Sequence, residues 1–329
     1  MKRLLLLSGA GTLASGAYAH VKWFVHLDAA PPADFQWYSF TDTAVQVWIT
    51  LALLFISLSV YLDFKLPVLR LKSERWRDTL ELVLRWLTGL SLLSAAIQGT
   101  LIAPHYPVRG LYGHGLLILE GVTAVMLLTP LARHAGMLLL VLFAGISLQV
   151  GGQIIEYLNV AGVGGYLLLR HWYSERRAVM ETYAVPVLRI ATGIALVWLG
   201  FSEKLLRPDF AQEFVQTYMW NFMYNLGVES FSDHLFVLSA GTMEVVFGII
   251  LILGTTTRLN ILVVSGFMLT SNLAFFMEGR SQEALTEIIG HMPIIAIAVV
   301  CLAQGAGQHW TITSLLRRLR CFQPVPVIK

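Results

Sequence analysis

Residues 285–302 read LTEIIGHMPIIAIAVVCL, an apolar run about as long as a bilayer crossing. Two ionisable residues, Glu287 and His291, stand near its start. Because they are four positions apart, a helix places them on one face, one above the other. Ionisable side chains in the hydrocarbon core cost several kcal/mol unless they have partners or a function. The stretch therefore predicts a membrane-spanning helix that carries polar groups into the protein interior.

Composition places the whole chain among polytopic membrane proteins. Of its 329 residues, 56% are hydrophobic and 13% are charged, and the mean hydropathy is +0.68; soluble domains are about 25% charged. The net charge of +3 is too small to favour nucleic acid as a partner. The two cysteines, Cys301 and Cys321, form no CxxC or CxxCH motif. We therefore expect no haem or iron–sulfur cluster on this chain.

The beginning of the chain is typical of an exported membrane protein. Residues 1–19, MKRLLLLSGAGTLASGAYA, combine a basic start, a short apolar core and a small-residue end, which predicts a signal peptide cleaved before His20. The alternative is an uncleaved anchor. Residues 20–42 then form an exported segment. Apolar spans of helical length follow at 43–63, 83–103, 114–131, 134–151, 154–170, 186–203, 233–254, 258–277 and 284–304.

The basic residues orient these spans. Lysine and arginine are concentrated in the loop at 64–82, at Arg133, Arg170 and Arg258, and in the tail at 306–329. By the positive-inside rule these parts are cytoplasmic. The pattern predicts a protein of the bacterial inner (plasma) membrane, with the mature N-terminus outside, in the periplasm, and the C-terminus in the cytoplasm. The charges from Lys72 to Arg77 would then face lipid head groups.

The chain repeats itself after about residue 80, with a first copy at 83–171 and a second at 186–305. The aligned pairs are LRWLTGLSLL (84–93) with LRIATGIALV (188–197), Glu120 with Glu244, and Glu156 with Glu287. Each copy has four spans and enters the membrane in the same sense, as parallel repeats do. The alternative is chance similarity among apolar helices. The duplication predicts an all-α protein, with one transmembrane helix at 43–63 followed by two four-helix bundles.

The two copies differ at their polar positions. Val160 replaces His291, and Gly99 and Thr100 replace Glu203 and Lys204. The first copy therefore keeps two carboxylates but lacks the histidine and the lysine. We expect any chemistry to lie in the second copy, with the first as a scaffold or partner surface. His105, in a loop of the first copy, is expected to be a solvated cap or an interface residue.

Several motifs of the second copy form a recognisable series. They are Arg189 near a helix start, WLGFSEKLLRP at 198–208, a glutamate-bearing helix that ends in GTTTR, and GHMP at 290–293. This series resembles the DoxX/DoxD-type membrane family, four-helix proteins named for a subunit of thiosulfate:quinone oxidoreductase. The resemblance is clear over residues 185–305 and weaker over 80–170. It implies association with the quinone pool, and the family's recurring polar positions fall on Lys204, Glu244, Glu287 and His291.

These four residues are our candidates for catalysis. A four-helix bundle can turn such side chains inward to one pocket, and Lys204 can neutralise either Glu244 or Glu287. His291 beside Glu287 supplies a hydrogen-bond partner and a proton acceptor for a quinol head group. The alternative is a structural network of ion pairs that holds the helices together.

The segment from Glu203 to Asp233 is rich in aromatic residues. We expect it to lie flat at the membrane interface, either as an anchor or as a lid for a lipid-like ligand. The candidates for quinone binding are Glu203, Trp198, Tyr218 and Trp220.

Cleavage before His20 would create a candidate metal site. The new N-terminal amine and the His20 imidazole, with His26 as a third nitrogen ligand, can chelate one copper ion. The alternative is an ordinary exported tether.

Taken together, the residues and the resemblance favour a quinone-interacting or redox-associated respiratory membrane subunit. Electron transfer would then need a partner protein in the membrane or periplasm, or a bound substrate. Membership of a quinone-linked oxidoreductase, and enzymatic activity itself, stay open. The alternative is a non-catalytic membrane scaffold or a small-molecule transporter that uses the same cluster structurally or for proton coupling. Membrane lipid is an expected contact in either case.

Overall fold

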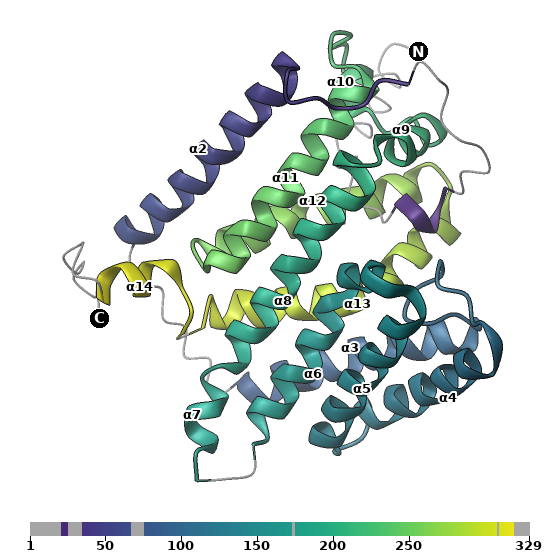
Figure 1. Ribbon diagram of the computed structural model, residues 1–329, viewed down its shortest axis with the longest axis vertical. Helices are drawn as coiled ribbons and strands as arrows, with labels where there is room; N and C mark the ends of the chain where they lie inside the picture. Colours follow the sequence, from purple (N-terminus) through teal and green to yellow (C-terminus); the bar gives the residue numbers. More distant parts are fainter. Residues whose placement is uncertain (1–20, 26–34, 67–75, 173–174, 308, 319–329) are drawn as a thin grey trace. The chain divides into compact units, whose positions relative to one another are not determined.

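The computed structural model describes residues 21–25, 35–66, 76–172, 175–307 and 309–318. The predicted signal peptide, His20 and His26 lie outside these ranges. Within them the chain is helical, with no strand and one isolated bridge between Thr100 and Pro107 (Figure 1). Eight helical segments are long and apolar enough to span a membrane. The prediction of an all-α membrane protein is therefore confirmed.

The helices follow the predicted spans closely. In chain order they are η2 Val21–Trp23, α2 Thr43–Lys65, α3 Arg77–Ile97, α4 Gly110–Leu127, α5 Ala132–Val150, η4 Gly151–Tyr157, α6 Leu158–Arg170, α7 Arg177–Glu181, α8 Ala184–Leu199, η5 Gly200–Leu205, α9 Pro208–Thr217, α10 Phe222–Asn225, α11 Asp233–Leu253, α12 Thr257–Met277, α13 Ser281–Gln304 and α14 Ile312–Arg318. The largest shift is at α3, which begins six residues before the predicted span and thus inside the predicted loop at 64–82.

One apolar segment, Ala132–Arg170, is long enough for two crossings. Its 39 residues would extend about 60 Å as a straight helix, roughly twice the hydrocarbon thickness. The chain turns at Gly151, which has a φ of 63°. A Cβ atom on Gly136 would lie 2.9 Å from the Gly164 carbonyl oxygen, so α5 and α6 pack side by side. The segment is a hairpin, and its two arms correspond to the two spans expected at 134–151 and 154–170.

The described residues fall into two compact units. Unit 1 contains those within 1–55, 197–246 and 263–288, and unit 2 contains those within 56–196, 247–262 and 289–329. This division does not follow the predicted copies, because α8, α11, α12 and α13 each have residues in both units. The boundaries of the copies therefore remain a prediction from sequence.

Unit 2 shows the same arginine contact in both copies. Arg85 Nε donates to the Leu127 carbonyl at 3.1 Å. Arg189, at the position of Arg85 in the repeat, donates to the Leu251 carbonyl, and Leu251 is the repeat equivalent of Leu127. Each arginine satisfies a carbonyl at a helix C-terminus, where the last backbone acceptors have no partner within the helix. The recurrence supports a duplication.

A glycine contact recurs in the same way. A Cβ atom on Gly89 would lie 3.0 Å from the Ala124 carbonyl oxygen, and one on Gly193 would lie 2.7 Å from that of Gly248. Ala124 and Gly248 are also equivalent positions. Both copies therefore bring their first and second helices into close backbone contact through a glycine, as small residues do in membrane bundles.

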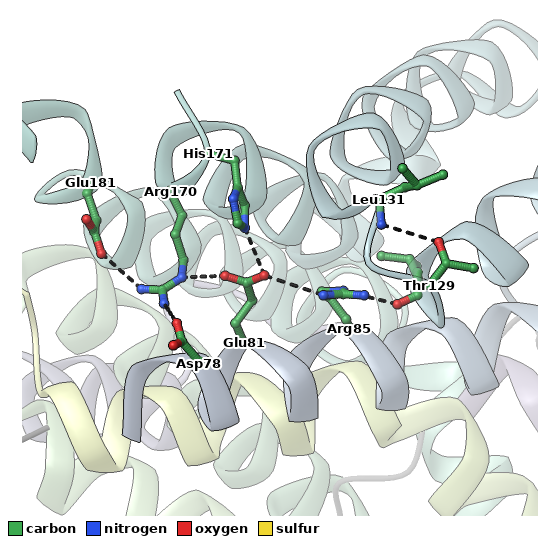
Figure 2. Close-up of polar contacts among 9 residues, drawn as sticks. Asp78, Glu81, Arg85, Thr129, Leu131, Arg170, His171 and Glu181 are labelled. Carbon is green, nitrogen blue, oxygen red and sulfur yellow. Dashed lines mark hydrogen bonds and ion pairs between the residues drawn. The ribbon is translucent and has the colours of Figure 1, made fainter. Parts of the chain in front are cut away.

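A charged cluster ties the ends of α3, α6 and α7 together in unit 2. Arg170 donates to Glu81, to Asp78 at 2.6 Å and to Glu181 at 3.0 Å, and His171 Nε2 lies 2.9 Å from Glu81 (Figure 2). Charge-assisted contacts of this kind are roughly twice as strong as neutral hydrogen bonds. The cluster fixes the end of the first bundle.

Arg77 belongs to the same end of the structure. It forms an ion pair with Glu181 at 3.5 Å. Because its side chain is also 35% exposed, the expectation that Arg77 faces lipid head groups stays a prediction. Lys72 and Arg75 lie outside the described residues.

Candidate functional site

The centre of the candidate site in unit 1 is an ion pair. Lys204 Nζ lies 2.9 and 3.0 Å from the two carboxylate oxygens of Glu244. The two side chains are only 3% and 1% exposed. Of the two partners that the sequence left open for Lys204, the structure selects Glu244 over Glu287. The two charges offset part of the cost that each would have when buried alone.

The backbone around Lys204 is unusual. Gly200–Leu205 forms a π-helical turn at the end of α8, and such turns occur often at functional sites. A Cβ atom on Gly200 would lie 2.8 Å from the Gly241 carbonyl oxygen, and one on Gly241 would lie 2.8 Å from Lys204 Cβ. The two glycines thus let η5 approach α11 closely enough for Lys204 to reach Glu244.

Glu203 is held by the N-terminal part of the chain. Its carboxylate is fully buried and accepts the backbone N–H of Val21 at 3.1 Å, and Lys22 Nζ lies 3.6 Å away. Glu203 and Lys204 are consecutive, yet they have different partners. We call residues 21–25, with the sequence VKWFV, the VKWFV segment. Sequence reasoning missed this contact because nothing local relates the exported segment to residues 182 positions later.

Glu287 and His291 are both buried on α13, at 0% and 3% exposure. Ser271 Oγ on α12 donates to Glu287 Oε1 at 3.1 Å, which is a contact within unit 1. His291 follows Glu287 by one helical turn and belongs to unit 2. In unit 1 the structure pairs Lys204 with Glu244 and gives Glu203 and Glu287 other partners, and the role expected of His291 stays a prediction.

Part of the aromatic segment belongs to a packed core. Trp220 is completely buried, with ring centroids 5.1 Å from Phe214 and 4.9 Å from Phe275. Tyr218 is 9% exposed, whereas Trp198 is 37% exposed. The expectation that this segment lies flat at the membrane interface stays a prediction. Within the protein, Trp220 and Tyr218 pack with residues of α9 and α12.

The VKWFV segment completes this core. The Phe24 ring centroid lies 6.0 Å from those of Phe214 and Tyr218 and 5.7 Å from that of Phe275. Burial raises the pKa of Tyr218, and the nearby Glu283 carboxylate raises it further. The Arg280 guanidinium lies 4.6 Å from the Tyr218 ring centroid, a distance typical of a cation–π contact.

A small cavity adjoins Lys204. Its volume is about 10 Å³, which is room for about one water molecule. Apart from Lys204, its lining is apolar and consists of Val21, Ala211, Phe214, Val215, Phe236, Val237 and Ala240. The donor set suits one oxygen atom of a ligand, such as a quinone carbonyl, because an ammonium has three N–H groups and Glu244 has two oxygens. A quinone ring does not fit without movement of the surrounding side chains.

The candidate copper site cannot be placed, because His20 and His26 lie outside the described residues. In the part of the chain that the structure describes, no group of three or more His, Cys, Asp or Glu residues could hold a metal ion.

The first copy has polar contacts that sequence reasoning missed. Glu156 accepts a hydrogen bond from Tyr106 Oη at 2.6 Å, and His105 Nε2 lies 2.8 Å from the same oxygen. The expectation that His105 is a solvated cap is wrong, since its side chain is only 11% exposed. Val160 stands at the repeat position of His291, but His105 brings an imidazole to Glu156 from another position. The histidine comes from a loop, so helix periodicity gave no signal for it.

Comparison with known proteins gives one match. No curated protein and no solved structure matches the chain. The family model for DoxX matches residues 184–277, which include Glu203, Lys204 and Glu244. The resemblance seen in the second copy is thereby confirmed over this range. The C-terminal part of this membrane protein is therefore similar to the DoxX family over residues 184–277.

Proposed function

We propose that this protein is a quinone-interacting membrane subunit that binds a quinone head group beside Lys204. The observation that carries the proposal is the buried Lys204–Glu244 pair next to a cavity with apolar and aromatic walls. An ion pair inside membrane-spanning helices is expensive, because the desolvation of two charges can exceed their mutual attraction. Such groups are functional by default in membrane proteins.

Lys204 would bind one quinone oxygen. Two of its N–H groups suffice for the oxygens of Glu244, which leaves the third for an acceptor in the cavity. Glu244 would hold the ammonium in place, and the rings around the cavity would exclude water. The bound quinone would supply two-electron redox chemistry, and the electrons would come from a partner protein or a bound substrate.

Access to Lys204 would require the VKWFV segment or the Phe214 side chain to move. Val21 and Phe214 both line the cavity, and Val21 is 2% exposed. With the orientation that the basic loops predict, this opening faces the exported half of the inner membrane.

The proposal is tested by mass spectrometry of the purified protein for co-isolated quinone, followed by labelling with a photoreactive azidoquinone. We expect quinone in the wild-type sample and labelled peptides from the cavity wall. Lys204→Met should lose both, whereas Lys65→Met, the same change at an exposed end of α2, should keep both. A wild-type protein with neither quinone nor label would overturn the proposal.

A second reading has one observation in its favour. The cavity holds about one water molecule, and the Lys204–Glu244 pair is complete without a ligand. A non-catalytic scaffold or a transporter that uses the pair structurally would show this geometry. In that case Lys204→Met would lower stability and leave quinone content at zero in every sample.

A further inference from the structure

The loop between α3 and α4 enters the interior of unit 2. Its residues 100–107 are closed by the bridge between Thr100 and Pro107 and by a hydrogen bond from Leu101 N–H to the Tyr106 carbonyl at 3.0 Å. Leu101 is 0% exposed and Ile102 is 6% exposed. Connecting segments usually run over the surface, because their backbone polar groups need water. Here the Ile102 N–H meets the Glu120 carboxylate, and other N–H groups of the loop meet backbone carbonyls within it.

The carboxylate at the centre of this arrangement is Glu120. It is 0% exposed in the middle of α4. Its two oxygens lie 2.9 and 3.1 Å from the backbone nitrogen of Ile102. Ile102 has a φ of 61°, a left-handed conformation that is strained for a β-branched residue. The donor to Glu120 is thus a neutral backbone N–H, and the strained conformation of Ile102 holds it in place.

No cation is paired with Glu120 among the described residues. Arg85 on α3 donates to the Leu127 carbonyl and lies 3.6 Å from Glu81. His105 in the loop bonds to Glu156. The other titratable groups on α3 and α5 and just before α4 are Arg77, Asp78, Glu81, Arg109, Arg133 and His134, and none of them is bonded to Glu120. Its single partner is the Ile102 N–H.

We propose that Glu120 is a proton-binding site, with its carboxyl group in the neutral acid form at neutral pH. An isolated carboxylate in a medium of low dielectric takes up a proton instead of staying charged. Glu244, at the equivalent position of the second copy, has the Lys204 ammonium beside both oxygens and stays ionised. The first copy thus binds a proton at Glu120 and is more than the scaffold or partner surface expected from the sequence.

The loop at 100–107 contacts both carboxyl groups of the first copy. It contacts Glu120 through Ile102 and contacts Glu156 through His105 and Tyr106. The His105 side chain is 11% exposed. The inference does not depend on quinone binding, because it concerns other residues and needs no added ligand.

Dicyclohexylcarbodiimide tests the proposal, because this apolar reagent modifies protonated carboxyl groups in membranes. The full-length protein in lipid vesicles is treated at neutral pH, and the adducts are mapped by mass spectrometry. We expect the adduct on Glu120, with at least tenfold less on Glu244. Glu120→Gln should remove it. Lys204→Met should make Glu244 reactive, which controls for access of the reagent to a carboxyl group at that position.

Infrared difference spectroscopy decides the case in which the reagent fails to reach Glu120. A neutral carboxylic acid has a carbonyl stretch above the amide band, and this band shifts in D₂O. The wild-type protein should show a band that Glu120→Gln lacks and that Glu244→Gln retains. Identical spectra for wild type and Glu120→Gln in this region would overturn the proposal, as would a Glu120→Gln protein that keeps the full adduct yield.

Discussion

Glu120 and Glu244 occupy equivalent positions in the two copies, yet their partners differ in charge. Glu244 has the Lys204 ammonium, and Glu120 has one backbone N–H from Ile102. The duplicated scaffold keeps the carboxyl group, and the residues before the second helix of each copy decide what that group meets. In the second copy a π-helical turn delivers a lysine, and in the first a buried loop delivers an amide. The comparison teaches that one helical framework supports an ion pair or a neutral acid, depending on one short connection.

The largest expected effect comes from breaking the ion pair. Lys204→Met leaves Glu244 buried without its counter-charge and should lower the free energy of unfolding by about 3–5 kcal/mol. Glu120→Gln should cost less than about 1 kcal/mol, since the amide keeps an acceptor for Ile102. Unfolding of both variants in mixed detergent micelles measures the difference.

The double variant Lys204→Met/Glu244→Gln is the control for this prediction. It removes both charges and should recover most of the lost stability. Equal costs for Lys204→Met and Glu120→Gln would break the contrast between the two copies.

The next largest effect on stability concerns Arg189 and Arg85, which donate to carbonyls at helix C-termini in the two copies. Arg189 donates to the carbonyls of Leu251, Ile252, Ala306 and Trp310, so Arg189→Met should cost roughly 3 kcal/mol. Arg85→Met should cost about 1–2 kcal/mol, because Arg85 has one carbonyl, that of Leu127, and a longer contact with Glu81. Thermal unfolding of the two variants should keep this order, and the reverse order would show that the two arginines do not act alike.

The glycine contacts sharpen the comparison further. Gly193→Ala places a methyl group 2.7 Å from the Gly248 carbonyl oxygen and should cost about 1–3 kcal/mol. Gly89→Ala, at 3.0 Å from the Ala124 carbonyl, should cost less. Gly121→Ala is the control, since a methyl group there meets nothing within 4 Å. It should be neutral or stabilising by up to about 1 kcal/mol. A cost for Gly121→Ala as large as that for Gly193→Ala would refute the close-contact explanation.

The smallest effect concerns the VKWFV segment, which has no counterpart in the first copy. Lys22→Ala removes the ammonium near Glu203 but keeps the Val21 N–H. It should cost at most about 1 kcal/mol, because Lys22 is 22% exposed. Lys22→Arg should restore stability in the same unfolding assay. A large cost for both variants would point to a role beyond charge pairing.

The fold was predictable because the hydropathy and the length of the apolar spans indicate the membrane-spanning helices. Each predicted span corresponds to a helix, and α3 starts early because its first turns carry the charged residues Arg77, Asp78 and Glu81, which lie outside the apolar window. Even the 39-residue hairpin was predicted as two spans, 134–151 and 154–170, and the turn lies at Gly151, where the first span ends.

The site was predictable only in part. Burial of Lys204, Glu244 and Glu287 follows from ionisable residues within apolar spans. The contact of His105 with Glu156 joins residues 51 positions apart through a loop, and the contact of Val21 with Glu203 spans 182 positions. Neither has a periodic signal. The burial of Trp220 was not predictable, because aromatic residues near a membrane interface suit an anchor and a packed core equally well.

The donors at Glu203 have a consequence for modularity. Val21 and Lys22 lie outside residues 184–277, the range that matches DoxX, and yet they satisfy a fully buried acid within it. A fragment cut at the family boundaries would lose the Val21 and Lys22 contacts of this buried acid. Transplanting this domain between proteins would therefore require that the pentapeptide travel with it.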